Sequence, residues 1–359
     1  MMDDTMKCKD QMSKSGRTVF GYYTISSVQG ASHVKDHTPC QDAYAFLNDG
    51  GCDHPFIMAI ADGHGDKRYD MSQYGSELAS KVAVKLLRRF YEELKDSHTL
   101  LFRSFRDDFP KHLIREWREE VLNHATDYGV DIEKPSEVFT RYGTTLLVAL
   151  VTKEEILIGQ LGDGDAVLVD GQGNCTTPFL QDDSLLGSAT YSLSSTEASR
   201  FWKAARMDYP TQTQFLALST DGLSNCFEDD DNFHKFMNSL YLNLKKSGPI
   251  SEYEGLSNIL FHYSQRGSGD DITLAAIELI GSKVGESPNP VGNVKEVKVA
   301  NPQSSVEKEA AGNKELDDDM PKMAEESLQK HEGSPIIHLS SKPDEESINL
   351  LFSRKDREI

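Results

Sequence analysis

The feature that most constrains this chain is a short apolar run ending in an Asp-Gly turn, a pattern that recurs along the sequence. The first example is the run 55–61, which is followed by Asp62-Gly63-His64-Gly65. An apolar run of this length, bounded by turn residues, predicts a buried β-strand. The turn would place a carboxylate, a bare backbone carbonyl and an imidazole at the strand end. One such pair is weak evidence, because Asp and Gly also punctuate ordinary strands.

Further carboxylates border apolar runs at four other places. These are Gln41-Asp42, Gly162-Asp163-Gly164-Asp165, Ser219-Thr220-Asp221-Gly222 and Asp270-Asp271-Ile272-Thr273. Together they predict a cluster of carboxylates at one rim of a sheet core, where their mutual repulsion would favour a bound cation. Carboxylate and carbonyl oxygens suit hard cations such as Mg²⁺ or Mn²⁺. His64 is placed to supply or take a proton near neutral pH.

Hydrophobic patterns between these turns predict the elements that support them. Apolar stripes at helical spacing predict amphipathic helices at 71–94 and within 109–127, packed on a sheet. The other expected elements are a strand at 19–27, a polar loop at 31–41, a hairpin at 144–170 turning near Lys153 and Glu154, short helices around 233–240 and 259–261, and a strand from Ile272. Residues 176–210 have no clear period and are expected to form a flap over the site.

The motifs are most specific when they are taken in order. Gly143-Thr144-Thr145 opens a further apolar run and completes the set. With it, the ordered motifs resemble the metal-dependent Ser/Thr protein phosphatases of the 2C type, in particular their bacterial branch, over about residues 18–280. The resemblance implies an α+β fold, an α-β-β-α sandwich of two antiparallel sheets flanked by helices, with a metal centre at its edge.

The resemblance also implies which residues bind metal. Asp62 is expected to bridge two cations, and the backbone carbonyl of Gly63 is expected to bind one of them. Asp221 and Asp270 are expected to complete the shell of the second ion. Asp163 matches the residue that holds a third ion together with Asp221. The expected cofactors are therefore two or three Mn²⁺ or Mg²⁺ ions.

The implied chemistry uses a water made acidic by paired cations, which also neutralise charge on the phosphoryl group. Asp42 is expected to accept a hydrogen bond from this water, and Asp62 to act in catalysis through the metal. The resulting hydroxide attacks phosphorus in line, and His64 protonates the departing Ser or Thr oxygen. No covalent phosphoenzyme is implied.

Three features depart from the family pattern. Gln41 stands where many members have Glu, and Asp165 stands where the common motif has Arg. The loop before Gln41 offers His33, Lys35 and His37 but no guanidinium to clamp a phosphate at two points. His37 is the candidate for the substrate phosphate in this loop, whereas His33 is expected to be a solvated or hydrogen-bonded polar residue.

Three other functions remain as alternatives. A pseudophosphatase with the same fold would bind a partner without catalysis. Another metal hydrolase, such as a phosphodiesterase, would usually have a His-rich ligand set, and this chain supplies Asp. Nucleotide binding through Gly159, Gly162 and Gly164 is disfavoured, since the segment lacks the Gly-Lys-Ser/Thr of a P-loop.

Composition limits the partners. The 359 residues have a formal net charge of −20, whereas nucleic acids and anionic membrane surfaces attract a surplus of Lys and Arg. No nucleic acid and no membrane is therefore expected as a partner. The expected partner is a phosphorylated protein, either a Ser/Thr kinase or its target.

The ends of the chain differ from its middle. Residues 1–17 are polar and are expected to form a flexible leader without a secretory signal. Residues 281–359 are expected to be an acidic, largely disordered tail with a short apolar segment at 347–352. The phosphatase domain would then span 18–280. The five cysteines form no C-x-x-C pair, which favours the reducing cytoplasm.

Overall fold

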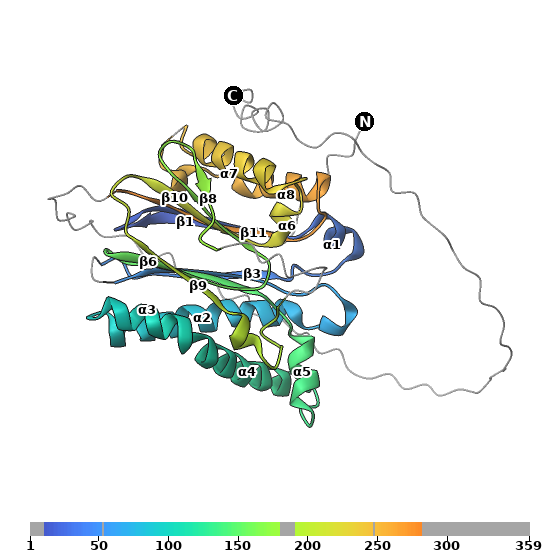
Figure 1. Cartoon of the computed structure of the whole chain (residues 1–359). Coiled ribbons are helices and arrows are strands. Elements are labelled where there is room, and N and C mark those ends of the chain that lie inside the picture. The colour runs from blue at the N-terminus through green and yellow to red at the C-terminus, as the bar shows by residue number, and fades with distance from the viewer. Residues whose placement is uncertain (1–10, 52–53, 180–190, 247, 282–359) are drawn as a thin grey trace, which may run out of the picture. The chain divides into compact units, whose positions relative to one another are not determined.

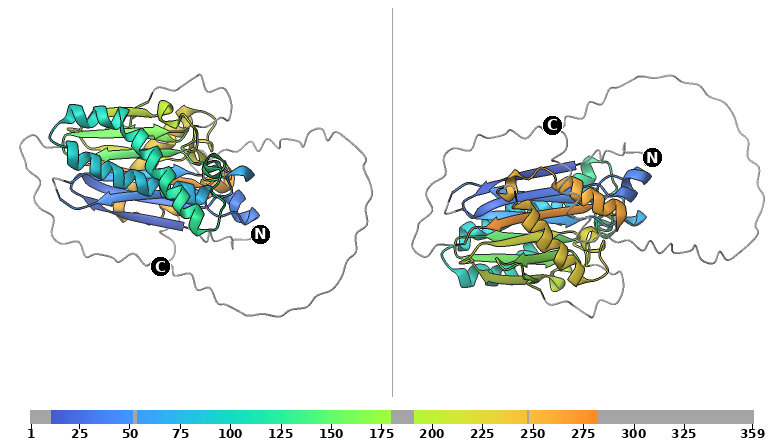
Figure 2. Two further views of the ribbon diagram at one scale, coloured as in Figure 1. Left: turned by 90° about the horizontal axis from the view of Figure 1, so that it is seen from below. Right: turned by 90° about the horizontal axis from the view of Figure 1, so that it is seen from above.

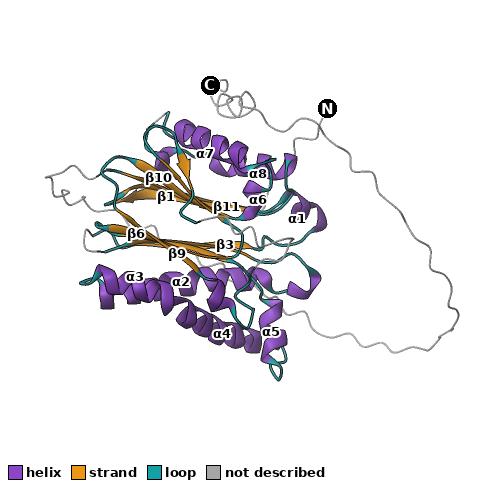
Figure 3. Ribbon diagram, viewed as in Figure 1, coloured by secondary structure: helices purple, strands orange, loops and turns teal. Residues whose placement is uncertain are grey.

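The computed structural model describes residues 11–51, 54–179, 191–246 and 248–281. These residues form two antiparallel sheets packed face to face, with helices on both outer faces (Figure 1, Figure 3). The expected α-β-β-α sandwich is confirmed.

Sheet A contains the strands nearest both ends of the described chain. Its order is β1 (Gln11–Thr18), β2 (Gly21–Val28), β11 (Ile272–Leu279), β10 (Gln214–Ser219), β7 (Asp165–Val169) and β8 (Cys175–Thr176). Sheet B has the order β3 (Asp42–Asn48), β4 (Phe56–Asp62), β5 (Leu146–Val151), β6 (Glu155–Leu161) and β9 (Lys203–Asp208). Neighbouring strands are antiparallel throughout both sheets.

Helices cover the outer face of each sheet. Those on sheet B are α2 (Ser72–Leu94), α3 (His98–Asp107) and α4 (Phe109–Asp127), and those on sheet A are α7 (Asp230–Leu244) and α8 (Leu256–Arg266). The teal α3 and α4 cross one face when the molecule is seen from below, and the gold and orange α7 and α8 cross the other from above (Figure 2). Shorter helices are α1 (Ala31–Asp36), η1 (Lys67–Tyr69), α5 (Pro135–Arg141), η2 (Ala198–Phe201), α6 (Asp221–Ser224) and η3 (Ile250–Glu252).

The inner faces of the two sheets form one apolar layer, and each outer face forms another with its helices. The central strands of sheet B are therefore buried on both sides, which explains why they read as continuous apolar runs rather than as alternating patterns. Under the helices, the indole of Trp117 is fully buried and its Nε1 donates to the Gly75 carbonyl at 3.0 Å. This contact joins α4 to the start of α2, close to the turn after β4.

Several predicted elements agree with the structure. The strand at 55–61 and the strand from Ile272 are β4 and β11, and the helices predicted at 71–94 and 109–127 are α2 and α4. The two short helices predicted further along the chain are confirmed as α7 and α8, with α7 longer than expected.

Four expectations were wrong in part. Residues 11–17 were assigned to a flexible leader but form most of β1, paired with β2. The loop at 31–41 begins with α1. The second arm of the predicted hairpin divides at Gly162, whose φ of 113° belongs to the left-handed region, and continues as β7 in the other sheet. The predicted flap contains β9, an edge strand of sheet B. The expected tail beyond residue 281 lies outside the described residues, as do residues 1–10.

Candidate metal and phosphate site

Strand ends from both sheets meet at one rim of the sandwich. Asp42 opens β3 directly opposite Asp62 at the end of β4, in sheet B. Asp221 follows β10 as the first residue of α6, and Asp270 lies just before β11, in sheet A. The carboxyl groups of Asp62 and Asp221 are within hydrogen-bonding reach of one another. The structure therefore brings together four of the carboxylates that the sequence singled out.

Thr220 joins the two halves of this rim. Its Oγ1 donates to Oδ2 of Asp42 at 2.8 Å and accepts from the backbone N–H of Thr273 at 2.9 Å. Both Thr220 and Asp42 are buried. One hydroxyl thus fixes a carboxylate of sheet B against strands of sheet A.

The turn after β4 is held by the segment before β5. The Thr144 hydroxyl and the Thr145 backbone N–H both donate to the Asp62 carbonyl at 2.8 Å, and the Asp62 N–H donates to the Thr145 hydroxyl at 3.1 Å. A Cβ on Gly63 would lie 2.7 Å from the Gln41 carbonyl oxygen. These contacts explain why the Asp-Gly turn and the Gly-Thr-Thr motif occur together.

The pKa values of the rim carboxyl groups are raised because these groups are buried close to one another. Burial, followed by the neighbouring charge of Asp271, raises the pKa of Asp42 well above its ordinary value. Burial and the charges of Asp42 and Asp221 do the same to the pKa of Asp62. Partial desolvation, with the charge of Asp221, raises the pKa of Asp270. Without a cation, the crowding of these carboxyl groups therefore disfavours their ionisation.

The donor set fits hard divalent cations, because it consists of carboxylate and carbonyl oxygens. Oδ1 of Asp42 is buried and has no hydrogen-bond partner, so the carboxylate keeps a free oxygen for water or an ion. In the described part of the chain, no three acidic, His or Cys side chains already converge into a metal-binding group. Binding would therefore require the rim carboxylates to turn toward a shared ion.

Asp163 and Asp165 lie at the same rim. Asp163 is exposed in the turn between β6 and β7. Asp165 begins β7 and has a buried oxygen without a hydrogen-bond partner. Burial raises the pKa of Asp165 to about 7, and the charges of Asp221, Asp230 and Asp163 add to this. The structure thus brings the predicted third-ion ligand, Asp163, into the same acidic environment as Asp221.

His64 lies beside the carboxylates, and its ring is in tilted contact with that of Tyr69. Its backbone N–H donates to the Gly143 carbonyl at 3.1 Å, and its ring centroid is 4.8 Å from that of Tyr69. Burial is the main cause that lowers the pKa of His64 to about 4; the charge of Asp221 opposes this shift, and the charge of Arg68 contributes to it. The imidazole is therefore neutral at pH 7 and would gain proton affinity from an adjacent phosphoryl anion.

His37, the predicted phosphate contact, is not brought into this group. It ends α1 with a left-handed φ of 59° and is exposed. Among the described residues it makes no ion pair with the rim carboxylates. Its role toward substrate stays a prediction.

Gln41 lies behind the turn that bears His64. Its Nε2 donates to the Ser72 hydroxyl at 2.6 Å, and its Oε1 is buried without a hydrogen-bond partner. The amide therefore ties the start of β3 to α2 and presents a carbonyl oxygen rather than a charge.

Sequence analysis missed the role of Asp271. Its carboxylate accepts from the backbone N–H groups of Gly30 and Gln41, each at 2.6 Å, and lies 2.9 Å from Nδ1 of His33. It is buried, whereas its neighbour Asp270 is exposed. Successive residues of an extended segment point in opposite directions, which could have suggested different roles for Asp270 and Asp271. The hydrogen-bond partners of Asp271, however, have no local signal in the sequence.

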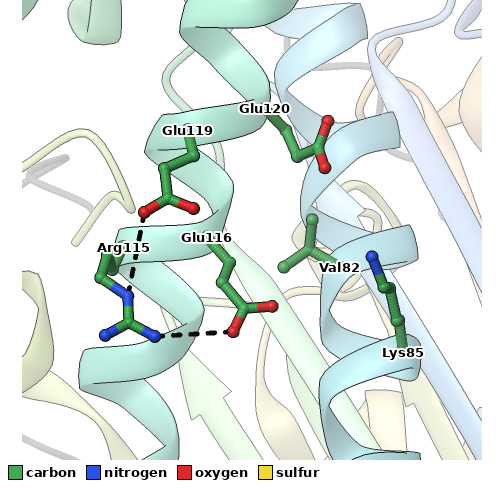
Figure 4. Close-up of a pocket in the computed structure, with 6 residues that line it drawn as sticks. All are labelled: Val82, Lys85, Arg115, Glu116, Glu119 and Glu120. Atoms are coloured by element: carbon green, nitrogen blue, oxygen red, sulfur yellow. Dashed lines mark ion pairs between the residues drawn. The ribbon is translucent and has the colours of Figure 1, made fainter.

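A separate pocket lies between α2 and α4 (Figure 4). It encloses about 340 Å³ and is lined by Val82, Lys85, Arg115, Glu116, Glu119 and Glu120. Arg115 pairs with Glu116 and Glu119 across 3.8 and 3.9 Å. None of these residues belongs to the carboxylate rim, so this pocket is not the candidate active site.

An α-β-β-α sandwich with acidic turns at one rim defines a class of phosphatase, and comparison with known proteins supports this class. A family model described as Protein phosphatase 2C matches residues 29–260. This chain belongs to the protein phosphatase 2C family, as its motifs predicted.

Individual relatives are more distant. Protein phosphatase 1L of Bos taurus is 26% identical over 151 residues, which are 42% of this chain and 36% of that protein. The match thus spans little more than a third of that relative's length. Two solved structures are a bacterial serine phosphatase (16% identity, 73% of this chain and 98% of the other, TM-score 0.47) and the catalytic domain of PstP in complex with two manganese ions (15%, 76% and 98%, TM-score 0.42).

Proposed function

We propose that this protein hydrolyses phosphoserine and phosphothreonine in proteins with a metal-activated water and without a phosphoenzyme. The observation that supports this most is the meeting of Asp62 and Asp221, from different sheets, with their carboxyl groups in hydrogen-bonding reach. Two carboxylates at this distance need a shared proton or a cation between them. Membership of the protein phosphatase 2C family supports the cation.

Mn²⁺ or Mg²⁺, in two or three ions, would be held by Asp62, the Gly63 carbonyl, Asp221, Asp270 and Asp163. When bound, such ions lower the pKa of water and neutralise charge on a phosphoryl group. Each of these residues lies at the end of a strand, in a turn or at the start of a helix, where the ends of strands from both sheets meet.

The remaining roles fall to residues around the ions. Asp42, oriented by Thr220, would hold and orient the attacking water through its unpartnered Oδ1. His64 is neutral at pH 7 in this structure; it would take up a proton from solvent beside the phosphoryl anion and, as imidazolium, give that proton to the departing Ser or Thr oxygen. The tilted contact with the Tyr69 ring, 4.8 Å between centroids, limits the positions open to the imidazole.

A phosphorylated protein is the proposed substrate, with a Ser/Thr kinase or its target as the expected class. The described cysteines Cys40, Cys175 and Cys226 form no disulfide, which supports a reducing compartment such as the cytoplasm. In the described residues no helix has the length and hydropathy needed to cross a bilayer.

Hydrolysis of p-nitrophenyl phosphate and of a phosphothreonine peptide, with Mn²⁺, Mg²⁺ or EDTA, tests the proposal. Asp62→Asn and Asp221→Asn should each abolish metal-dependent turnover, whereas Asp96→Asn, at an exposed position after α2, should leave it intact. Turnover that persists in EDTA would contradict the metal mechanism.

A pseudophosphatase is the second candidate, because the loop before Gln41 has no guanidinium for the phosphate. A well-folded sample without turnover in any metal would favour this reading. The protein would then act as a binding module.

A further inference from the structure

The segment that follows the Asp-Gly-His-Gly turn adds Arg68 to the contact between the His64 and Tyr69 rings. Asp66 caps η1 by accepting from the Arg68 backbone N–H at 3.0 Å. The guanidinium of Arg68 lies over the Tyr69 ring, 5.0 Å from its centroid, and the Tyr69 ring lies 4.8 Å from that of His64. Arg68, Tyr69 and His64 therefore form a continuous series from the solvent to the carboxylate rim.

Gly143 fixes the inner part of this series. A Cβ at this position would lie 2.8 Å from Cδ2 of His64 and 2.8 Å from Cδ1 of Tyr69, which is closer than real Cβ contacts. Both rings thus pack directly on the Gly143 backbone. Because Tyr69 is placed relative to His64 in this way, the guanidinium that packs on Tyr69 is placed as well.

Arg68 differs from Arg141 and His33, the engaged cations near the rim, in having unused hydrogen-bonding capacity. It is 66% exposed, and its only described ion pair joins Nε to Asp66 at 3.5 Å. No described residue hydrogen-bonds its terminal nitrogens. By contrast, Arg141 makes two hydrogen bonds to Asp70, at 2.7 and 2.8 Å. His33 is engaged with the buried Asp271.

We propose that Arg68 binds the phosphoryl oxygens of the substrate beside His64, an inference that rests on the proposed function. A guanidinium presents two parallel N–H groups that match two oxygens of a phosphomonoester. The guanidinium packs on the Tyr69 ring, which itself packs on the His64 ring, so Arg68 lies one ring away from His64. Arg68 would thus supply the guanidinium that the loop at 31–41 lacks.

Binding of inorganic phosphate to the Mn²⁺-loaded protein, measured by titration calorimetry, tests this without requiring turnover. Loss of one charge-assisted, two-point contact should weaken phosphate binding by about tenfold in Arg68→Ala. Arg68→Lys keeps the charge but loses the two parallel N–H groups, so its affinity for phosphate should lie between those of Arg68→Ala and the unaltered protein. Lys67→Ala removes an adjacent exposed cation and should change binding by less than about twofold.

Steady-state kinetics then separate the alternatives. If Arg68 binds the phosphoryl group, Arg68→Ala should raise KM for p-nitrophenyl phosphate and for phosphopeptides alike. An effect confined to peptides with acidic flanking residues would overturn the assignment, as would phosphate affinity equal to that of the unaltered protein, or no phosphate binding by the unaltered protein. Weaker phosphate binding in a protein without turnover would support Arg68 and reject the proposed catalysis.

Discussion

At the scale of single residues, the geometry of the rim depends on glycine and threonine residues, which carry no charge. Gly63 and Gly143 permit backbone and ring contacts that any side chain would block. Thr220 and Thr145 hold carboxylate-bearing residues through their hydroxyls. The charged residues could be predicted from the sequence because the ordered series of Asp motifs at strand ends is specific. The contacts that orient these side chains could not be predicted, since they join residues far apart in the sequence.

Gly143→Ala should lower phosphatase activity more than it lowers the stability of the fold. The added methyl would force His64 and Tyr69 apart, since it would lie 2.8 Å from each ring. We expect kcat to fall by at least about tenfold, equivalent to about 1.4 kcal/mol of activation free energy. Phosphatase assays and thermal unfolding would be compared with Gly171→Ala, where the nearest atom is 3.8 Å away. Equal kcat in the two variants would contradict the role of this contact.

Thr220→Val should destabilise the fold. The substitution leaves the buried Asp42 oxygen without its donor and the Thr273 N–H without its acceptor. Each unmade buried hydrogen bond costs about 1–3 kcal/mol. Chemical denaturation should show this loss in free energy of unfolding, and Thr220→Ser, which retains the hydroxyl, should recover most of it. No difference between Val and Ser would show that the hydroxyl is unimportant.

At the scale of elements, hydrophobic periodicity predicts the helices whose position depends on apolar packing against a sheet. α2 and α4 were predictable because their apolar stripes must cover a sheet. β1 was not, because it is a polar edge strand stabilised by its backbone pairing with β2. The division of the predicted hairpin arm at Gly162 could not be predicted for another reason. β6 and β7 are both apolar, and only the tertiary structure assigns them to different sheets.

α1 offers a pH test at this scale. The hydrogen bond to Asp271 raises the pKa of His33, with the charges of Asp271, Asp270 and Asp36 in the same direction and burial opposing them. A raised pKa in the folded state means that this stabilisation is complete below the ordinary His pKa, near 6.5. It is lost as pH rises through the folded value.

His33→Gln should therefore cost more stability at acid pH than at alkaline pH. We expect a loss of about 1–2 kcal/mol at pH 5.5 and a smaller loss at pH 8.5. Urea denaturation at both pH values measures it. His54→Gln provides the control, because His54 is 43% exposed and lies 3.6 Å from Glu92. A loss that is the same at both pH values would contradict an ionised His33.

At the scale of the whole molecule, the rim couples the two sheets. Asp42 and Asp62 lie in strands of one sheet, whereas Asp221 and Asp270 flank strands of the other. The carboxylates repel one another across the sandwich unless protons or cations are present. Stability of the complete domain should therefore report on ion binding.

Mn²⁺ should raise the melting temperature, and EDTA should remove the gain. An ion present at about 100 times its Kd stabilises the folded state by about 2.7 kcal/mol. Scanning calorimetry of Asp221→Asn should show a much smaller shift, since one ligand of the pair is neutral. A full Mn²⁺ shift in this variant would argue against Asp221 as a ligand.

Strand order also has a consequence for synthesis of the chain. β11 is the last described strand to leave the ribosome, yet it lies inside sheet A between β2 and β10. Until it inserts, β2 and β10 are both exposed edges, and Asp270 is missing from the rim. A nascent chain that ends before β11 can therefore complete sheet B, but it has no finished site. Acquisition of the site is thus postponed until translation of the domain is complete.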